Sequence, residues 1–386
     1  MLKVLTLSTL FPDANRPVLG TFVERQTLSL AARPDVEMQI VVPRGLPPGP
    51  LARYRHYRAI SKLPTYEDWH GVPLHRPRFT HWPGIGGRTD VRNMVRVLKP
   101  LLARIREAFA FDVIDAEYFF PDGPVAVALG KHFNVPVSIK ARGSDIHLWG
   151  TRTDTRTQVL VAGRAADGML AVSAALKRDM VALGMPAERI SVHRTGVDPA
   201  LFKVTDRAMA KAQLGVAQPL IVSVGSLNLR KGHEIVIAAL TQLPEAMLAI
   251  AGSGESRARL ETLAQQYGVA HRVRFLGSIG RGEVAQWLIA ADVMALAPTS
   301  EGLANAWIEA LACGTPVVTC DVGGACEVIT HHVAGRLVER TPDAVAAGIA
   351  ALLADPPARQ DVAACVKDFT WEANTAALYA HLRGLI

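Results

Sequence analysis

Short apolar runs alternate with amphipathic segments along the first half of the chain. The apolar runs are rich in β-branched residues and predict strands at Lys3–Leu10, Glu37–Val42, Val113–Ala116, Val135–Ile139 and Gly168–Val172. The segments between them predict helices at Thr21–Ala32, Arg88–Ala110, Pro124–Phe133 and Ala174–Leu183. Alternation of strands and helices favours a parallel sheet with helices on both faces.

The same rhythm restarts near residue 219. Strands are predicted at Leu220–Val224, Met247–Ala251, Val273–Leu276, Val293–Ala297 and Pro316–Cys320. Helices are predicted at Glu234–Leu243, Ser256–Tyr267, Glu283–Ala290, Ala304–Cys313 and Asp343–Ala354. Two such series predict two α/β domains, which a chain of 386 residues also favours. We place the boundary between Asp198 and Pro219.

Residues 43–90 break the rhythm, because they are rich in Pro, Gly, Arg and aromatic residues and have poor periodicity. Their basic and aromatic residues cluster at Arg53, Tyr54, Arg55, His56, Tyr57 and Arg58. A long irregular insertion of this kind is often functional. Contact with a lipid interface or an acceptor, a plain loop, and stacking on nucleic-acid bases all remain open. No recognisable nucleic-acid fold motif supports the last of these.

Charge and cysteine content indicate the kind of partner and the cellular location to expect. Residues 1–195 hold 27 Lys and Arg against 17 Asp and Glu, whereas residues 196–386 hold 15 against 18. The basic first half favours an anionic partner, such as a membrane surface or a phosphorylated acceptor, although a solvated basic surface is the plain alternative. Four isolated cysteines without metal-site spacing predict reduced thiols. With neither a signal peptide nor a transmembrane run, we expect a cytoplasmic protein, with peripheral association at the inner membrane face.

The segment from Ser300 to Thr319 carries the strongest chemical signal. Gly302 permits a sharp turn before a helix that begins near Ala304, and the exposed amides at a helix start suit a phosphate. Glu301 precedes those amides, and Glu309 lies one to two turns into the helix. Two carboxylates flanking a phosphate site match a nucleotide sugar, which has hydroxyl groups on both sides of its diphosphate. Taken alone, the two residues could equally be a helix-end charge and a surface residue.

Two weaker stretches follow strands in the same half. Val224–Glu234 places Ser226, Arg230 and Lys231 between a strand and a helix, which suits a phosphate clamp but lacks the order of a Walker A loop. Ile250–Glu255 holds Gly252 and Gly254, which favour close backbone approach to a ligand. No dinucleotide fingerprint accompanies them, and a dehydrogenase is therefore disfavoured.

Taken together, these motifs resemble family 4 of the retaining glycosyltransferases over nearly the whole chain. The matching pieces include PVLGTF from Pro17, RGSD from Arg142, TGVDPALF from Thr195, LRKG from Leu229, GSGE from Gly252, RVRFLG from Arg272, EGLANAWIEALACGTPVV from Glu301 and GGACE from Gly323. The resemblance implies the GT-B fold, in which two Rossmann-like domains with parallel sheets face each other across a cleft. It implies an N-terminal acceptor domain over residues 1–198, a C-terminal donor domain over 199–368, and a helix over 369–386 that crosses back.

The resemblance also implies roles for individual residues. Lys231 would neutralise the donor diphosphate, and Glu309 would bind the ribose hydroxyls. Glu301 would hold the donor sugar together with the amides of Gly302, Leu303, Ala304 and Asn305. Further donor contacts would come from Ser226, Arg230, Gly252 and Gly254, and, from the first domain, Gly20 and Thr21. The backbone around Phe275 would contact the nucleobase. The catalytic set implied is Lys231, Glu301, Arg142 and Asp145. No metal or other cofactor is expected.

The chain departs from the family pattern at two positions. Arg142 stands where the family often has His, and Ser226 stands where it often has Arg. Because arginine stays charged, Arg142 cannot act as a general base, and it suggests an anionic acceptor or a different set of hydrogen bonds.

The resulting hypothesis is a retaining, metal-independent hexosyltransferase. It would move a sugar from a UDP- or GDP-sugar to a glycan or lipid-linked glycan in cell-surface or exopolysaccharide synthesis. A GT-B nucleotide-sugar epimerase and an inactive nucleotide-sugar-binding subunit are the alternatives. Isomerisation of a donor without acceptor would identify the first, and nucleotide binding without turnover the second.

Overall fold

A computed structural model describes the backbone of all 386 residues and every side chain except those of Arg55 and His56. The chain forms two compact units. Unit 1 comprises Met1–Arg194 together with Trp371–Ile386, and unit 2 comprises Thr195–Thr370. The divisions therefore fall at 194/195 and 370/371, where the family resemblance implied 198/199 and 368/369.

Unit 1 is built on an eight-stranded sheet of order β10-β9-β8-β7-β1-β2-β5-β4, parallel except at the edge pair β4 and β5. Its strands are β1 (Leu2–Leu7), β2 (Val36–Val41), β4 (Tyr66–Trp69), β5 (Val72–His75), β7 (Val113–Ala116), β8 (Val137–Ala141), β9 (Gly168–Ala171) and β10 (Ile190–Val192). Its larger helices are α1 (Thr21–Ala31), α3 (Gly86–Ala108), α4 (Asp122–Phe133), α5 (Arg156–Ala165), α6 (Ala174–Ala182) and α15 (Trp371–Arg383). The central strands are buried nearly throughout, which explains their continuous apolar runs.

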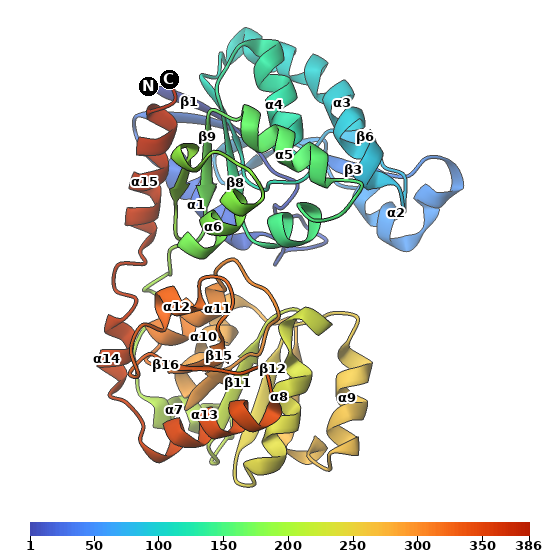
Figure 1. The fold of residues 1–386 in the computed structure, drawn as a ribbon. Coiled ribbons are helices and arrows are strands. Elements are labelled where there is room, and N and C mark those ends of the chain that lie inside the picture. Colours follow the sequence, from blue (N-terminus) through green and yellow to red (C-terminus); the bar gives the residue numbers. More distant parts are fainter. The chain divides into compact units, whose positions relative to one another are not determined.

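Helix α15 completes unit 1, although it follows unit 2 in the chain. It lies beside α1, and Leu378 and Leu382 join the hydrophobic core around β1 and β2 (Figure 1). The side chain of His381 is hydrogen-bonded to Ser138 at 2.9 Å, so the helix also contacts β8. The last residues of the chain therefore belong to the core of the first unit.

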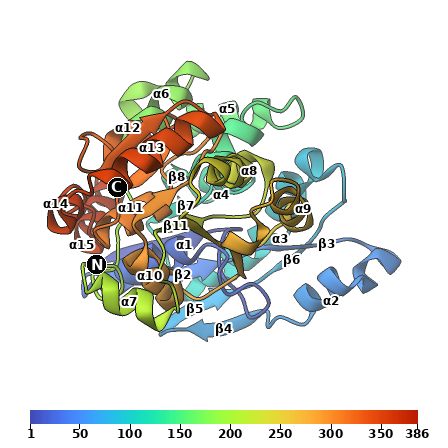
Figure 2. The ribbon, with the colours of Figure 1, turned by 90° about the horizontal axis from the view of Figure 1, so that it is seen from below.

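The insertion over residues 43–90 is structured, contrary to the irregular segment that its composition suggested. Besides β4 and β5, it contains the two-stranded parallel sheet of β3 (Arg44–Leu46) and β6 (Arg78–Thr80) and the short helix α2 (Arg55–Ser61). The strands are three or four residues long and are interrupted by Pro and Gly, so they are too short to show a period. Figures 1 and 2 both show α2 at the periphery of unit 1.

Unit 2 has a six-stranded, wholly parallel sheet of order β13-β12-β11-β14-β15-β16. The strands are β11 (Leu220–Val224), β12 (Met247–Ala251), β13 (Val273–Gly277), β14 (Val293–Ala295), β15 (Val317–Cys320) and β16 (Gly335–Val338). The helices are α7 (Arg207–Gln213), α8 (His233–Ala239), α9 (Arg257–Gln266), α10 (Arg281–Ala290), α11 (Asn305–Ala312), α12 (Ala325–Val328), α13 (Pro342–Ala354) and α14 (Arg359–Ala364). In the order of the chain this is the doubly wound arrangement 3-2-1-4-5-6.

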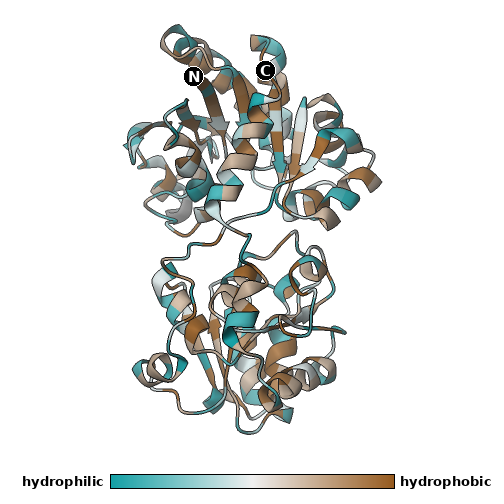
Figure 3. Cartoon of the chain, turned by 90° about the vertical axis from the view of Figure 1, so that its left-hand side faces the viewer, coloured by the Kyte–Doolittle hydropathy of each residue, from teal (hydrophilic) through white to brown (hydrophobic). Residues whose placement is uncertain are grey.

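Hydropathy follows this architecture. Strands of both sheets are largely coloured as hydrophobic in Figure 3, whereas hydrophilic segments alternate along the helices. No helix in the described part of the chain is both long and apolar enough to cross a bilayer.

The strand orders fix where a ligand site is expected in each unit. In open α/β sheets, ligands bind beyond the carboxyl ends of the strands, at the point where the strand order reverses. In unit 2 that point lies between β11 and β14, and in unit 1 it lies between β1 and β7. A ligand site is therefore expected in the loops that leave these four strands.

Candidate active site

The loop after β11 presents a lysine at the reversal point of unit 2. Leu229–Lys231 form a single 3₁₀ turn, and Gly232 then takes a left-handed conformation with φ +71° before α8 begins. A Cβ atom on Gly232 would lie 1.8 Å from the carbonyl oxygen of Ala297, in the segment after β14. Gly232 thus allows the two loops to touch. The amide of Thr299 also donates to the carbonyl of Arg230 at 2.9 Å.

The loop after β14 brings Glu301 to the same place. Lys231 Nζ donates to Glu301 Oε1 at 2.5 Å, and the two side chains are 15% and 9% exposed. Arg230 Nη1 lies 3.8 Å from Glu301 Oε2 and donates to the Ser300 carbonyl at 2.9 Å. Two cations therefore share one nearly buried carboxylate. An anion that reaches Lys231 competes directly with Glu301.

The start of α11 follows Glu301 by four residues. Ala304 occupies the N-cap and supplies no side-chain hydrogen bond to the helix amides. The first amides of a helix have no partner within the helix, so those around Asn305 can donate to a ligand. The carbonyl of Gly302 accepts from the amide of Gly324 at 2.8 Å, so the loop before α12 supports this turn.

Glu309, on the second turn of α11, has a different partner from Glu301. Its Oε1 accepts from Arg281 Nη2 at 3.2 Å, and its side chain is 17% exposed. Burial raises the pKa of Glu309 above its ordinary value, and Arg281 opposes that rise. The guanidinium of Arg281 also lies over the ring of Phe202 at 5.4 Å. Glu309 is thus an anchored acceptor with one oxygen not engaged by this arginine.

The two glycines after β12 allow close packing of neighbouring loops. A Cβ atom on Gly252 would lie 1.8 Å from the Gly225 carbonyl oxygen, and one on Gly254 would lie 2.3 Å from that of Leu227. Ser226, between Gly225 and Leu227, accepts a hydrogen bond from Asn228 at 2.9 Å. The glycines therefore support the loop that leads to Lys231.

The predicted nucleobase contact, Phe275, lies on β13. Its ring is covered by the guanidinium of Arg257 at 4.6 Å. An arginine over an aromatic face already forms a cation–π contact. The backbone of β13, to which the prediction applies, pairs with β12 up to a register shift beside Ala251.

In unit 1, Gly20 and Thr21 mark the start of α1. Gly20 is the N-cap, with φ +68°, and a Cβ atom there would lie 2.5 Å from the Leu10 carbonyl oxygen. The β1–α1 loop is therefore folded tightly against its own beginning. Both residues lie beyond the carboxyl end of β1, at the reversal point of this sheet.

Arg142 follows β8 and is held by Glu117, which follows β7. Its Nη2 pairs with the carboxylate of Glu117, and its Nε donates to the Glu117 carbonyl at 3.1 Å. The guanidinium also lies over the ring of Phe22 at 5.0 Å. The Arg142 side chain is 7% exposed and that of Glu117 is fully buried. The arginine charge is therefore largely compensated within the unit, which disfavours the anionic acceptor site that its presence suggested.

Asp145 stabilises the backbone before it. Its carboxylate accepts from the amides of Arg142 and Gly143 at 2.8–3.0 Å and from that of Phe119 at 2.9 Å. Burial raises the pKa of Asp145, and these amides oppose the rise. With no exposed surface, Asp145 acts by fixing the Arg142 turn.

The predicted residues thus form two groups. Lys231, Arg230 and Glu301 meet in unit 2, with Glu309 further along α11, and Gly20, Thr21, Arg142 and Asp145 belong to unit 1. Sequence reasoning missed two side chains, Arg281 and Glu117, which fix Glu309 and Arg142. They are separated from their partners by 28 and 25 residues, so no local pattern could have revealed them. No cluster of three or more potential metal ligands occurs among the described side chains.

Two family models match the chain, one in each half. "Glycosyltransferase Family 4" matches residues 23–201, and "Glycosyl transferases group 1" matches residues 204–367. Together they leave unmatched only the two ends of the chain and two residues between them.

Similar curated proteins are glycosyltransferases. An uncharacterized glycosyltransferase of Methanocaldococcus jannaschii is 34% identical over 48% of this chain and 51% of its own length. A D-inositol 3-phosphate glycosyltransferase of Xylanimonas cellulosilytica is 36% identical over 55% and 56%. These matches span about half the length of either relative. The putative teichuronic acid biosynthesis glycosyltransferase TuaC of Bacillus subtilis is 26% identical over 86% of this chain and 84% of its own length.

Solved structures share the fold at low identity. The sucrose-phosphate synthase of Thermosynechococcus elongatus matches with a TM-score of 0.84 at 23% identity, over 100% of this chain and 99% of its own. The Anabaena protein Alr3699/HepE, solved in complex with UDP, matches with a TM-score of 0.74 at 22% identity over the full length of both chains.

Proposed function

Since this chain belongs to the family 4, group 1 glycosyltransferases of GT-B fold, we propose that it transfers a hexose from a nucleotide sugar to a glycan acceptor with retention of anomeric configuration. The donor proposed is a UDP- or GDP-sugar. A UDP complex of the similar Anabaena protein supports a nucleotide donor. Retention rests on the family resemblance.

The observation that carries this proposal is the Lys231–Glu301 pair at the reversal point of unit 2. Lys231 Nζ lies 2.5 Å from Glu301 Oε1, and the start of α11, which has no side-chain cap, follows four residues later. A diphosphate placed at the helix start would lie within reach of Lys231. Glu301 would then be released to accept hydrogen bonds from hydroxyls of the donor sugar. When the donor binds, the Lys231 ammonium thus exchanges the Glu301 carboxylate for the diphosphate, and the Glu301 carboxylate exchanges Lys231 for sugar hydroxyls.

In the proposed reaction this site stabilises the leaving diphosphate. As the bond to the anomeric carbon breaks, negative charge grows on the diphosphate oxygen. Lys231 and the α11 amides are preorganised to stabilise that charge, and such stabilisation is usually the largest single contribution to catalysis. An acceptor hydroxyl attacks the anomeric carbon on the face that the nucleotide leaves, and its proton passes to the departing diphosphate oxygen. Because lysine and amides supply the stabilisation, we propose that transfer is metal-independent.

Glu309 and Arg281 provide the nucleotide end of the proposed site. Glu309 accepts hydrogen bonds from the ribose hydroxyls through the oxygen that Arg281 does not engage, while Arg281 keeps it ionised and in place. The backbone of β13 near Phe275 contacts the base, and Gly252 and Gly254 support the loop between.

We further propose a cell-surface glycan, free or lipid-linked, as the acceptor. Similarity to TuaC, named for teichuronic acid biosynthesis, supports polysaccharide synthesis. The basic first half of the chain favours contact with an anionic membrane surface at the cytoplasmic face. Full transfer to a neutral soluble sugar with no binding to anionic vesicles at low salt would refute this part.

The test of the donor site is a calorimetric panel of UDP, GDP and ADP on the full chain. One of them should bind, and its sugar should be hydrolysed or transferred by the wild-type protein. Lys231→Ala should cut transfer and Glu309→Ala should weaken nucleotide binding. Wild-type transfer by both variants would refute the site.

A further inference from the structure

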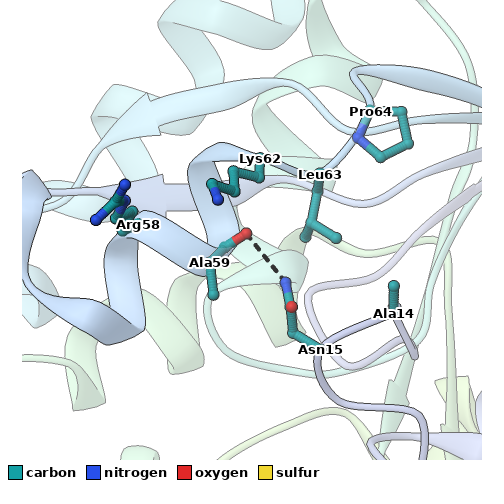
Figure 4. A pocket seen from close by; sticks show the side chains of 7 residues that line it. All are labelled: Ala14, Asn15, Arg58, Ala59, Lys62, Leu63 and Pro64. Carbon is teal, nitrogen blue, oxygen red and sulfur yellow. Dashed lines mark hydrogen bonds between the residues drawn. The ribbon is translucent and has the colours of Figure 1, made fainter.

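Unit 1 carries a pocket lined by none of the residues predicted to act in transfer. It lies between the β1–α1 loop and α2 and has a volume of about 590 Å³. Pockets that hold small ligands fall in the range of about 300–1,000 Å³. Figure 4 shows the residues that line it, namely Ala14, Asn15, Arg58, Ala59, Lys62, Leu63 and Pro64.

The charged wall of the pocket is wholly cationic. Arg58 and Lys62 are four residues apart at the end of α2, so they share one face of the helix. Both side chains are exposed, and the described side chains supply neither with an ion pair. Two like charges at this spacing repel each other, and an anion between them would remove the repulsion.

Neighbouring carboxylates are already paired with arginines outside the pocket. Asp13, two residues before Asn15, lies 2.9 Å from both Arg16 and Arg44, and Glu67 pairs with Arg76. Between residues 38 and 66 the sequence has five Lys and Arg and no Asp or Glu. The positive charge of the pocket is therefore available to a ligand.

The remaining walls combine one amide with apolar surface. Asn15 Nδ2 donates to the Ala59 carbonyl at 3.0 Å, which joins the β1–α1 loop to α2 across the pocket (Figure 4). Leu63 is buried at 7% exposure. The loop that carries Asn15 ends at Gly20, on the side of the sheet where transfer is proposed. A ligand seated here would therefore extend along a loop of the transfer site.

We propose that this pocket is a phosphate-binding site, in which Arg58 and Lys62 hold a phosphate or diphosphate group and the apolar wall contacts the part attached to it. Arg forms paired hydrogen bonds to phosphate, and Lys adds a point charge. A lipid-linked acceptor and an anionic phospholipid both present this group. The site is separate from the proposed donor site, and its acceptor version rests on the proposed function.

The site is tested by calorimetric titration of pyrophosphate into the full-length Lys231→Ala variant, which weakens the donor diphosphate site. Adding Arg58→Ala and Lys62→Ala should lower pyrophosphate affinity at least tenfold. The matched control adds Arg92→Ala and Arg96→Ala, which removes two exposed basic residues at the same spacing on α3. The control should stay within twofold. Equal affinities in the two backgrounds would overturn the proposal.

Two further measurements identify the source of the phosphate, with Lys231 restored. If the acceptor supplies it, the Arg58→Ala/Lys62→Ala variant should show at least a tenfold higher KM for a prenyl-diphosphate-linked acceptor, with donor hydrolysis unchanged. If a membrane lipid supplies it, this variant should lose sedimentation with phosphatidylglycerol vesicles and keep that KM. A variant unchanged in both would overturn the site even if donor hydrolysis is intact. Absence of nucleotide binding by the wild type would instead refute the proposed function alone.

Discussion

Replacement of Glu301 by Gln should tighten the binding of the nucleoside diphosphate while slowing sugar transfer. Glu301 holds Lys231 at 2.5 Å. At an effective dielectric constant of about 20, unit charges at this distance attract by about 7 kcal/mol. A diphosphate oxygen has a similar attraction to Lys231 in the wild type and in the variant, and the attraction to Glu301 that the wild type loses is largely offset by renewed hydration of the released carboxylate, so these contributions largely cancel between the two proteins.

The contribution that remains is repulsion between the Glu301 carboxylate and the diphosphate. With the displaced carboxylate roughly 7 Å from the diphosphate charge, this repulsion is about 2 kcal/mol per pair of unit charges. Screening and relaxation reduce it, and we expect a net gain of about 1 kcal/mol for Glu301→Gln, or roughly fivefold in affinity. Transfer should fall at least tenfold, because hydrogen bonds to a charged acceptor contribute about 1.5–3 kcal/mol.

Calorimetry with the nucleoside diphosphate that the wild type binds would measure the first effect, and donor turnover the second. Glu245→Gln is the matched control, because it makes the same charge change at an exposed position of unit 2. Lys231→Ala should change the affinity in the opposite direction. The reasoning fails if Glu301→Gln weakens nucleotide binding, or tightens it no more than the control does.

Three further predictions concern backbone strain and titration. Gly232→Ala should lower the free energy of unfolding at least twice as much as Gly215→Ala. Both glycines have positive φ, which costs alanine about 1–2 kcal/mol of backbone strain, but only a Cβ atom at Gly232 meets a backbone oxygen, at 1.8 Å. Equal losses of the two variants in urea denaturation would contradict this prediction. Nucleotide affinity should fall as pH is lowered through the raised pKa of Glu309. Arg281→Ala should move the midpoint of this fall to higher pH, because Arg281 opposes the rise in pKa. A midpoint measured by calorimetry at or below the ordinary pKa of 4.5 would exclude this role of Glu309. Burial raises the pKa of Asp122 to about 7 from 3.8. The unfolded state therefore loses its proton first, and the free energy of unfolding falls by about 4 kcal/mol as pH rises between these values. Asp122→Asn should remove this fall, and an unchanged pH slope in chemical denaturation of the variant would refute the prediction.

The central architecture could be predicted from the sequence because buried parallel strands have a local signature. The ranges predicted for β7, β11 and β12 match the structure residue for residue, since a polar or turn residue follows each strand. The elements of residues 43–90 could not be predicted in the same way. A strand such as β6 has three residues, Arg78–Thr80, of which only the middle one is buried.

The positions of the site residues could be predicted from the sequence better than the contacts between them. Lys231 and Glu301 could be placed at strand ends, but their contact depends on β11 and β14 being neighbours in the sheet. The partner of Arg142 depends in the same way on the adjacency of β7 and β8. Sheet order is set by long-range packing that a single sequence does not display. This is why charge at Arg142 could be seen from the sequence and its compensation by Glu117 could not.

The return of α15 to unit 1 has a consequence for biosynthesis. A ribosome completes all of Thr195–Thr370 before it makes Trp371–Arg383, so unit 2 can fold while the first unit still lacks its last helix. Until then the core that Leu378 and Leu382 later cover stays open to solvent. The N-terminal unit, which usually folds first during synthesis, is here the last to be completed. A nascent chain stalled before residue 371 would therefore engage chaperones through unit 1.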